Sequence, residues 1–143
     1  MKPSSILVVD DEEVMRDVLG RLLGQAGYAV TLAEDGARGL ALARKQTFDA
    51  AIVDIMLPEL GGLELLDELR KHDPELVVVM ITAFASVETA LTAMKKGAFD
   101  YVTKPFKHEE VLHILANGLK VRGTHLDCLL YEVVEARVLE RSK

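Results

Sequence analysis

Disulfides, tryptophan and long hydrophobic runs are missing from this sequence. Its 143 residues include a single cysteine, Cys128, which cannot form an internal disulfide, so a small disulfide-stapled secreted scaffold is excluded. No apolar stretch approaches the roughly 20 residues that span a bilayer. The N-terminal residues 1–5 lead into a strand without a signal-peptide cleavage region. We therefore expect a soluble cytoplasmic protein that does not contact a membrane.

Basic residues are too few to balance the acidic ones. The formal net charge is −6 and the sequence pI is about 5.2, whereas a domain that grips nucleic acid directly has a basic face. Direct binding to nucleic acid is therefore not expected, and any role in gene control would be indirect. With 50% hydrophobic residues, the chain has enough apolar side chains for one domain with a core of ordinary size.

Apolar runs of strand length alternate with stretches of helical period. This alternation predicts a doubly wound, flavodoxin-like α/β fold, in which a five-stranded parallel sheet of order 2-1-3-4-5 is covered by helices on both faces. Strands are expected near residues 5–9, 28–33, 49–53, 76–81 and 99–102. Helices are expected near residues 12–26, 35–45, 61–71, 86–96 and 107–122, and Gly27 is expected to end the first of them in a left-handed conformation.

The C-terminal residues predict a sixth helix. Gly123 can end the fifth helix, Thr124 can cap a new one, and an apolar stripe then continues to Val138. We expect this helix to cover about 124–141, and we divide the chain into a domain at 1–122 and a linker helix at 123–143. The linker either packs on its own domain or leads to an effector domain or a dimer partner, and the second reading is favoured.

Polar side chains stand where the apolar strands end. The first predicted strand ends in Asp10-Asp11 and the third ends in Asp54. Charged groups are rarely buried unless they are paired or bind a metal, so acids at these positions indicate a site. In the predicted sheet the two strands are neighbours at the point where the strand order reverses, which is where such sheets bind ligands. Thr82 follows the fourth strand and Lys104 the fifth, at the same edge.

These residues together resemble the receiver domain of bacterial two-component response regulators, most closely receivers attached to AAA+ transcription activators. The resemblance covers residues 5–122. It rests on four motifs: Val8-Val9-Asp10-Asp11-Glu12, Asp54-Ile55-Met56-Leu57-Pro58 with Gly61-Gly62, Ile81-Thr82-Ala83, and Tyr101-Val102-Thr103-Lys104-Pro105-Phe106.

The resemblance implies that Asp54 is a phosphoacceptor, to which a sensor histidine kinase transfers a phosphoryl group. It also implies a Mg²⁺ (or Mn²⁺) site. Asp11, Asp54 and the backbone carbonyl of Met56 would be direct ligands, and Asp10 would act largely through water. A divalent cation would relieve the repulsion among the three aspartates.

Three more residues would receive and report the phosphoryl group. Lys104 would neutralise phosphoryl oxygens, and the Thr82 hydroxyl would rotate toward one of them. Tyr101 would then move inward, although a half-buried strand aromatic with no switching role is a real alternative. The family usually has a cis bond at the position of Lys104-Pro105, but the sequence leaves the isomer of this bond open.

The expected output surface is the face formed by the fourth helix, the fifth strand and the fifth helix. Charged residues at positions 95, 96, 108 and 109 are candidates for pairing between two molecules, so dimerisation through this face or through the C-terminal helix is a hypothesis. Control of transcription is the expected output. The kinase, the signal and the lifetime of the phosphoryl group cannot be read from the sequence.

Other classes of protein can carry acids at the same edge of such a sheet. A phosphohydrolase that forms an aspartyl phosphate would have its two acids two residues apart after the first strand, but Asp10 and Asp11 are adjacent. A flavodoxin-like cofactor binder would need a glycine-rich loop there, and the acids at 10–13 would repel phosphate. A stand-alone receiver is a further alternative, as is a pseudo-receiver that serves only in assembly. The pseudo-receiver would show no Mg²⁺-dependent phosphorylation. The chain is not expected to be an enzyme beyond its own phosphorylation and dephosphorylation.

Overall fold

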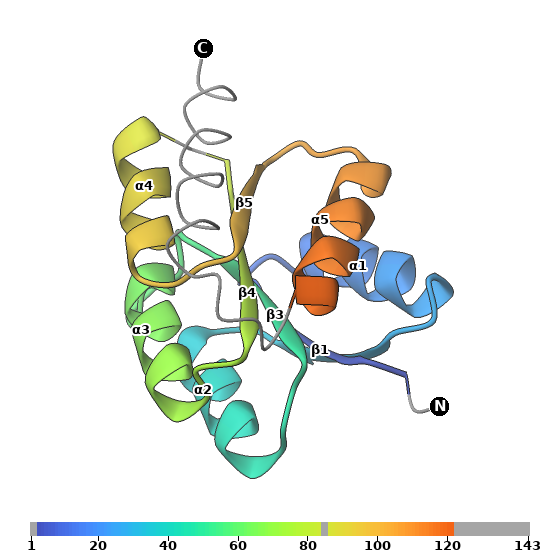
Figure 1. The fold of residues 1–143 in the computed structure, drawn as a ribbon, viewed down its shortest axis with the longest axis horizontal. Coiled ribbons are helices and arrows are strands. Elements are labelled where there is room, and N and C mark those ends of the chain that lie inside the picture. Colours follow the sequence, from blue (N-terminus) through green and yellow to red (C-terminus); the bar gives the residue numbers. More distant parts are fainter. Residues whose placement is uncertain (1–2, 84–85, 122–143) are drawn as a thin grey trace.

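The predicted apolar runs form the five strands of one sheet (Figure 1). The computed structural model describes residues 3–83 and 86–121. Within them, the strands are β1 (Ser5–Val9), β2 (Ala29–Ala33), β3 (Ala50–Asp54), β4 (Val77–Thr82) and β5 (Asp100–Thr103). All neighbouring strands are parallel, and their order is β2-β1-β3-β4-β5. The predicted sheet and its strand order are confirmed.

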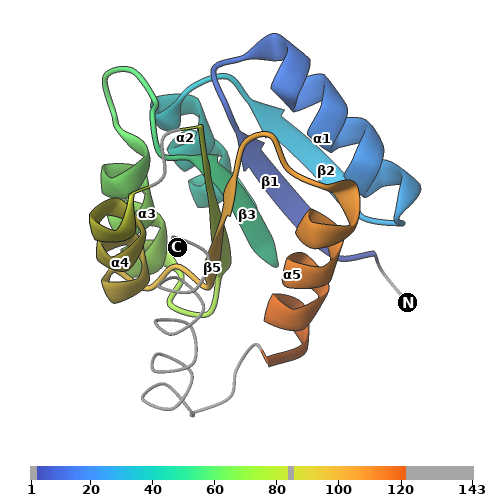
Figure 2. The same cartoon turned by 90° about the horizontal axis from the view of Figure 1, so that it is seen from above.

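Helices cover both faces of this sheet (Figure 2). Within the described residues they are α1 (Glu13–Gln25), α2 (Gly36–Lys45), α3 (Gly62–His72), α4 (Val87–Lys95) and α5 (His108–Val121). Helices α1 and α5 lie on one face, and α2, α3 and α4 lie on the other. Each of the five helices begins within one residue of its predicted start, and α1, α2, α3 and α4 also end within one residue of their predicted ends.

The central strands are buried on both sides, which explains their nearly continuous apolar sequences. Along β1, Leu7 and Val9 belong to the core beneath α2, α3 and α4, whereas Ile6 and Val8 belong to the core beneath α1 and α5. Every residue of β3 is buried, including the terminal Asp54. A strand enclosed in this way holds its last side chain in a fixed position, so the end of β3 is a rigid support for a functional group.

Local sequence sets the ends of several helices. Gly27 has a φ of 95°, a left-handed conformation that glycine adopts without a Cβ penalty, and it follows the end of α1 as predicted. The Asp35 side chain accepts a 2.7 Å hydrogen bond from the Arg38 backbone N–H at the start of α2. Ser86 caps α4 in the same way through the Thr89 backbone N–H at 3.0 Å.

Two further predictions concern the C-terminal part of the chain and the absence of membrane-spanning helices. The predicted helix at 124–141 and the division of the chain at residue 123 lie outside the described residues. Among the described residues, the search for a helix of sufficient length and apolarity to cross a bilayer finds none.

Candidate functional site

The register of the sheet brings the predicted site residues to one edge. Val9 of β1 lies opposite Val53 of β3, so Asp10 and Asp54 follow at neighbouring positions. On the other side of β3, Asp54 pairs with Ile81 of β4, one residue before Thr82. Thr82 in turn pairs with Thr103 of β5, which precedes Lys104. The carboxyl ends of four strands therefore meet where the strand order reverses.

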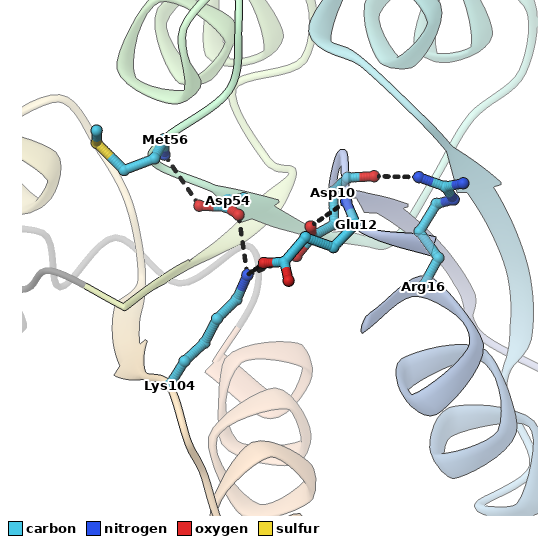
Figure 3. Close-up of polar contacts among 6 residues, drawn as sticks. All are labelled: Asp10, Glu12, Arg16, Asp54, Met56 and Lys104. Atoms are coloured by element: carbon cyan, nitrogen blue, oxygen red, sulfur yellow. Dashed lines mark hydrogen bonds and ion pairs between the residues drawn. The ribbon is translucent and has the colours of Figure 1, made fainter. Parts of the chain in front are cut away.

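Lys104 lies at the centre of the site (Figure 3). Its Nζ lies 3.0 Å from Asp10 Oδ2, 3.0 Å from Glu12 Oε1 and 3.0 Å from Asp54 Oδ2. The Lys104 side chain is 9% exposed, Asp10 is fully buried and the Asp54 side chain is 5% exposed, whereas the Glu12 side chain is 63% exposed. One ammonium thus faces three carboxylates, two of them buried, and negative charge is in excess.

The pKa values of two groups follow from this arrangement. Burial raises the pKa of the Asp10 carboxyl above its ordinary value, and the Asp54 charge adds to the rise, although the Glu12 backbone N–H and Lys104 act in the opposite direction. Burial alone lowers the pKa of Lys104, but its hydrogen bonds to the three carboxylates outweigh this effect and the pKa is raised. Lys104 is therefore a stable positive charge at neutral pH.

Backbone groups hold the buried acids in place. The backbone N–H of Glu12 donates to Asp10 Oδ1 at 2.9 Å, and that of Met56 donates to Asp54 Oδ1 at 2.9 Å. Each aspartate therefore bonds the N–H two residues on, a local turn that fixes the side chain. Arg16 from α1 adds a hydrogen bond from Nη1 to the Asp10 carbonyl oxygen at 2.8 Å. Each acid presents its second oxygen to Lys104 (Figure 3).

The acidic oxygens are close enough together to share a metal ion. One carboxylate oxygen from each of Asp10, Glu12 and Asp54 lies within 4.8 Å of the others. Asp11, predicted as a direct ligand, is exposed and is not part of this group, so its role stays a prediction. For Met56, the structure shows the backbone N–H on Asp54, and a role for its carbonyl also stays a prediction.

Sequence reasoning did not identify Glu12 as a site residue. The available signal was its place in the acidic run that follows β1, directly after the two aspartates. Such a run reads equally well as the solvated start of a helix, and the side chain is indeed largely exposed. Only the position of Lys104 shows that the Glu12 carboxylate turns toward the site.

The two predicted switch residues are both buried. Thr82 is 1% exposed at the end of β4, and Tyr101 is 2% exposed in the core beneath α2, α3 and α4. Tyr101 is therefore more deeply buried than the half-buried aromatic considered from the sequence. The Lys104-Pro105 peptide bond, whose isomer the sequence left open, is cis.

Comparisons with known proteins agree with this geometry. The "Probable transcriptional regulatory protein TcrX" of Mycobacterium tuberculosis is 41% identical over 122 residues, which are 85% of this chain and 52% of that protein. The "Regulatory protein AtoC" of Escherichia coli is 38% identical over 118 residues, covering 82% of this chain and 26% of AtoC. AtoC is of the AAA+ activator type, as the resemblance predicted. The chain thus spans about half of TcrX and a quarter of AtoC.

A solved structure and a family model complete the assignment. The crystal structure of the receiver domain of NtrX from Brucella abortus superposes with a TM-score of 0.77 at 38% sequence identity, covering 80% of this chain and 98% of that one. The family model described as the response regulator receiver domain matches residues 6–116. That segment contains the whole of the acidic site and all five strands except Ser5, the first residue of β1. The chain belongs to the response regulator receiver domain family, and this segment is a regulatory domain.

Proposed function

We propose that this receiver domain is a phosphoacceptor switch in which Asp54 takes a phosphoryl group from the phosphohistidine of a sensor histidine kinase. The observation that carries the proposal is the position of Lys104, whose ammonium lies 3.0 Å from oxygens of both Asp54 and Asp10. An ammonium fixed beside the acceptor carboxylate can stabilise phosphoryl oxygens as they arrive. Phosphoryl transfer depends chiefly on such positioning and charge stabilisation.

The reaction is a nucleophilic substitution at phosphorus. An Asp54 carboxylate oxygen forms the new P–O bond while the P–N bond of phosphohistidine breaks. The electron pair of that bond stays on the imidazole nitrogen, and the ring leaves neutral when its other nitrogen carries a proton. The hydrogen bond from the Met56 backbone N–H holds the Asp54 carboxylate in a fixed orientation for attack. Lys104 then bonds the phosphoryl group as well as the carboxylate.

The donor set fits Mg²⁺ or Mn²⁺. It consists of carboxylate oxygens alone, which these hard cations prefer, and the excess negative charge around Lys104 calls for a further cation. Asp10 and Asp54 would hold the ion, with Glu12 within reach and with Asp11 and the Met56 carbonyl as the ligands predicted from the resemblance. When bound, the ion supplies positive charge that offsets repulsion between the carboxylates and the incoming phosphoryl group.

The switch would be read out through Thr82 and Tyr101. A phosphoryl group on Asp54 favours a Thr82 hydroxyl turned toward it, since Asp54 and Thr82 end neighbouring strands. If the turned Thr82 hydroxyl favours the buried position of the Tyr101 ring, phosphorylation also shifts the population of conformations of the face formed by α4, β5 and α5. Control of transcription is the proposed output, because the relatives that this chain partly matches are transcriptional regulatory proteins.

Dimerisation through the α4, β5 and α5 face is a further part of the proposal. Lys95, His108 and Glu109 are exposed on it. Lys96 is already paired within the chain, with Nζ 2.8 Å from Asp67 Oδ2, so it is a weaker candidate for contacts between molecules. The C-terminal helix predicted from the sequence is the alternative dimer contact.

Intact mass after incubation with a small phosphoryl donor and Mg²⁺ tests the central step. The unsubstituted protein should gain the mass of one phosphoryl group, and Asp54→Asn should gain none. Asp17→Asn, at an exposed position of α1, is the matched control for loss of one aspartate and should be modified normally. No added mass on the unsubstituted protein would refute the proposal and favour a pseudo-receiver that acts only in assembly. Repeated turnover of a phosphate monoester would favour a phosphohydrolase.

A further inference from the structure

The hydrogen-bonding capacity of Lys104 is fully used in this structure. A lysine ammonium has three N–H donors and no acceptor. Its three partners are Asp10, Glu12 and Asp54, each at 3.0 Å from Nζ. A phosphoryl oxygen on Asp54 can therefore receive a donor from Lys104 only if one of these carboxylates gives up its bond.

The three carboxylates differ in what it costs to release them. Asp10 is fully buried and the Asp54 side chain is 5% exposed, so either of them would be left as a poorly solvated charge. The Glu12 side chain is 63% exposed, and water can replace the lysine at once. Glu12 is thus the partner that leaves most easily.

The backbone around Glu12 leaves its side chain independent of the fold. Glu12 is the N-cap residue of α1, but its side chain makes no capping hydrogen bond. The backbone N–H of Glu12 donates to Asp10, and its carbonyl oxygen accepts from the Arg16 backbone N–H at 3.0 Å. Both of these bonds survive when the carboxylate turns away, so α1 and the loop before it are not disturbed.

We infer that Glu12 is the exchangeable partner of Lys104. It holds the ammonium over the buried aspartates in the unphosphorylated protein and yields its place to a phosphoryl oxygen when Asp54 is modified. Glu12 is a positioning residue that acts through Lys104, and the inference rests on the proposed phosphorylation of Asp54. Repulsion between the Glu12 carboxylate and the anionic phosphoryl group acts in the same direction as the exchange.

The consequence is that Glu12 slows phosphorylation. Glu12→Gln removes a charge-assisted bond, so one Lys104 donor becomes more readily available to the phosphoryl donor. An exposed ion pair corresponds to roughly 1.5-fold to 5-fold in a rate or equilibrium, which sets the expected acceleration. Glu13→Gln makes the same change of charge at the next position, where the side chain is exposed and outside the three-carboxylate group around Lys104.

The experiment measures the rate of phosphorylation by a small phosphoryl donor at saturating Mg²⁺ for the unsubstituted protein and both variants. Glu12→Gln should be about 1.5-fold to 5-fold faster, and Glu13→Gln should match the unsubstituted protein. Equal rates for Glu12→Gln and Glu13→Gln, or a slower Glu12→Gln, would overturn the inference while leaving Asp54 as the phosphoacceptor. Absence of phosphorylation in the unsubstituted protein would instead remove the proposed function on which the inference rests.

A crystal structure with beryllofluoride, a phosphoryl mimic, provides a second test. If Glu12 had only a structural role, its contact with Lys104 would be the same with and without the mimic. Lys104 Nζ should bond a fluorine atom and remain close to Asp54, while its distance from the Glu12 carboxylate exceeds 4.0 Å. A lysine that keeps Glu12 and releases Asp10 would refute the exchange.

Discussion

Removal of the Lys104 charge should destabilise the fold when no divalent cation is present. Lys104→Met keeps a long apolar stem but leaves Asp10, which is fully buried, and Asp54, whose side chain is 5% exposed, without their ammonium. Removing one partner of a buried ion pair costs about 3 to 5 kcal/mol, because the remaining charge is uncompensated. We expect the lower end, about 3 kcal/mol, because protonation of Asp10 offers partial relief.

Urea unfolding followed by far-UV circular dichroism measures this loss, since the sequence has no tryptophan to serve as a fluorescent probe. With a slope of about 2 kcal/mol per molar urea, a loss of 3 kcal/mol lowers the midpoint by about 1.5 M. Lys71→Met is the matched control. The Lys71 side chain is 75% exposed, and its Nζ lies 3.6 Å from Glu68 Oε1. The urea midpoint of Lys71→Met should therefore fall by only a small fraction of about 1.5 M.

Repeating the urea unfolding with added Mg²⁺ tests the same reasoning a second time. A divalent cation that binds among the carboxylates replaces the lost positive charge, so Mg²⁺ should stabilise Lys104→Met more than the unsubstituted protein. The gap between the two midpoints should therefore narrow as Mg²⁺ is added. Equal midpoints for Lys104→Met and Lys71→Met, or a gap that widens with Mg²⁺, would refute the reasoning.

Three other predictions follow from the same structure. A Cβ on Gly62 would collide with the backbone oxygen of Asp54, so Gly62→Ala should cost about 3 kcal/mol of unfolding free energy and slow phosphorylation. Gly24→Ala, where nothing lies within 4 Å, should instead be neutral or stabilise by about 0.5 to 1 kcal/mol, and equal effects in urea unfolding would count against the account. Burial raises the pKa of Asp10, so its ionisation costs stability as the pH rises above the unfolded value near 3.8. Without Mg²⁺, Asp10→Asn should therefore gain stability relative to the unsubstituted protein as the pH rises above about 4, and a difference independent of pH in thermal unfolding would contradict this. Finally, the sedimentation mass should rise when beryllofluoride is added if the domain dimerises on phosphorylation, and an unchanged mass in both states would count against dimerisation.

The architecture and the location of the site can be predicted from the amino-acid sequence alone. Apolar runs such as Ile6–Val9 and Ala50–Val53 are long enough for strands, and the helical stretches between them require parallel connections. Parallel strands present all their carboxyl ends at one edge, so acids that follow the first and third runs must meet there. Because these two strands lie side by side in the predicted order, Asp10 and Asp54 are predicted to be neighbours.

The set of side chains that share the site, in contrast, depends on contacts between segments that are far apart in the sequence. Glu12 and Lys104 are 92 residues apart, and their 3.0 Å contact depends on how two loops leave the sheet and on the reach of two flexible side chains. The same loop geometry leaves Asp11 exposed although it stands between two residues that face the lysine. Side chains alternate between the two faces of the sheet along a strand, so their direction is fixed there. This alternation ends where the strand ends. Beyond that point, the direction depends on hydrogen bonds and charges contributed by distant segments.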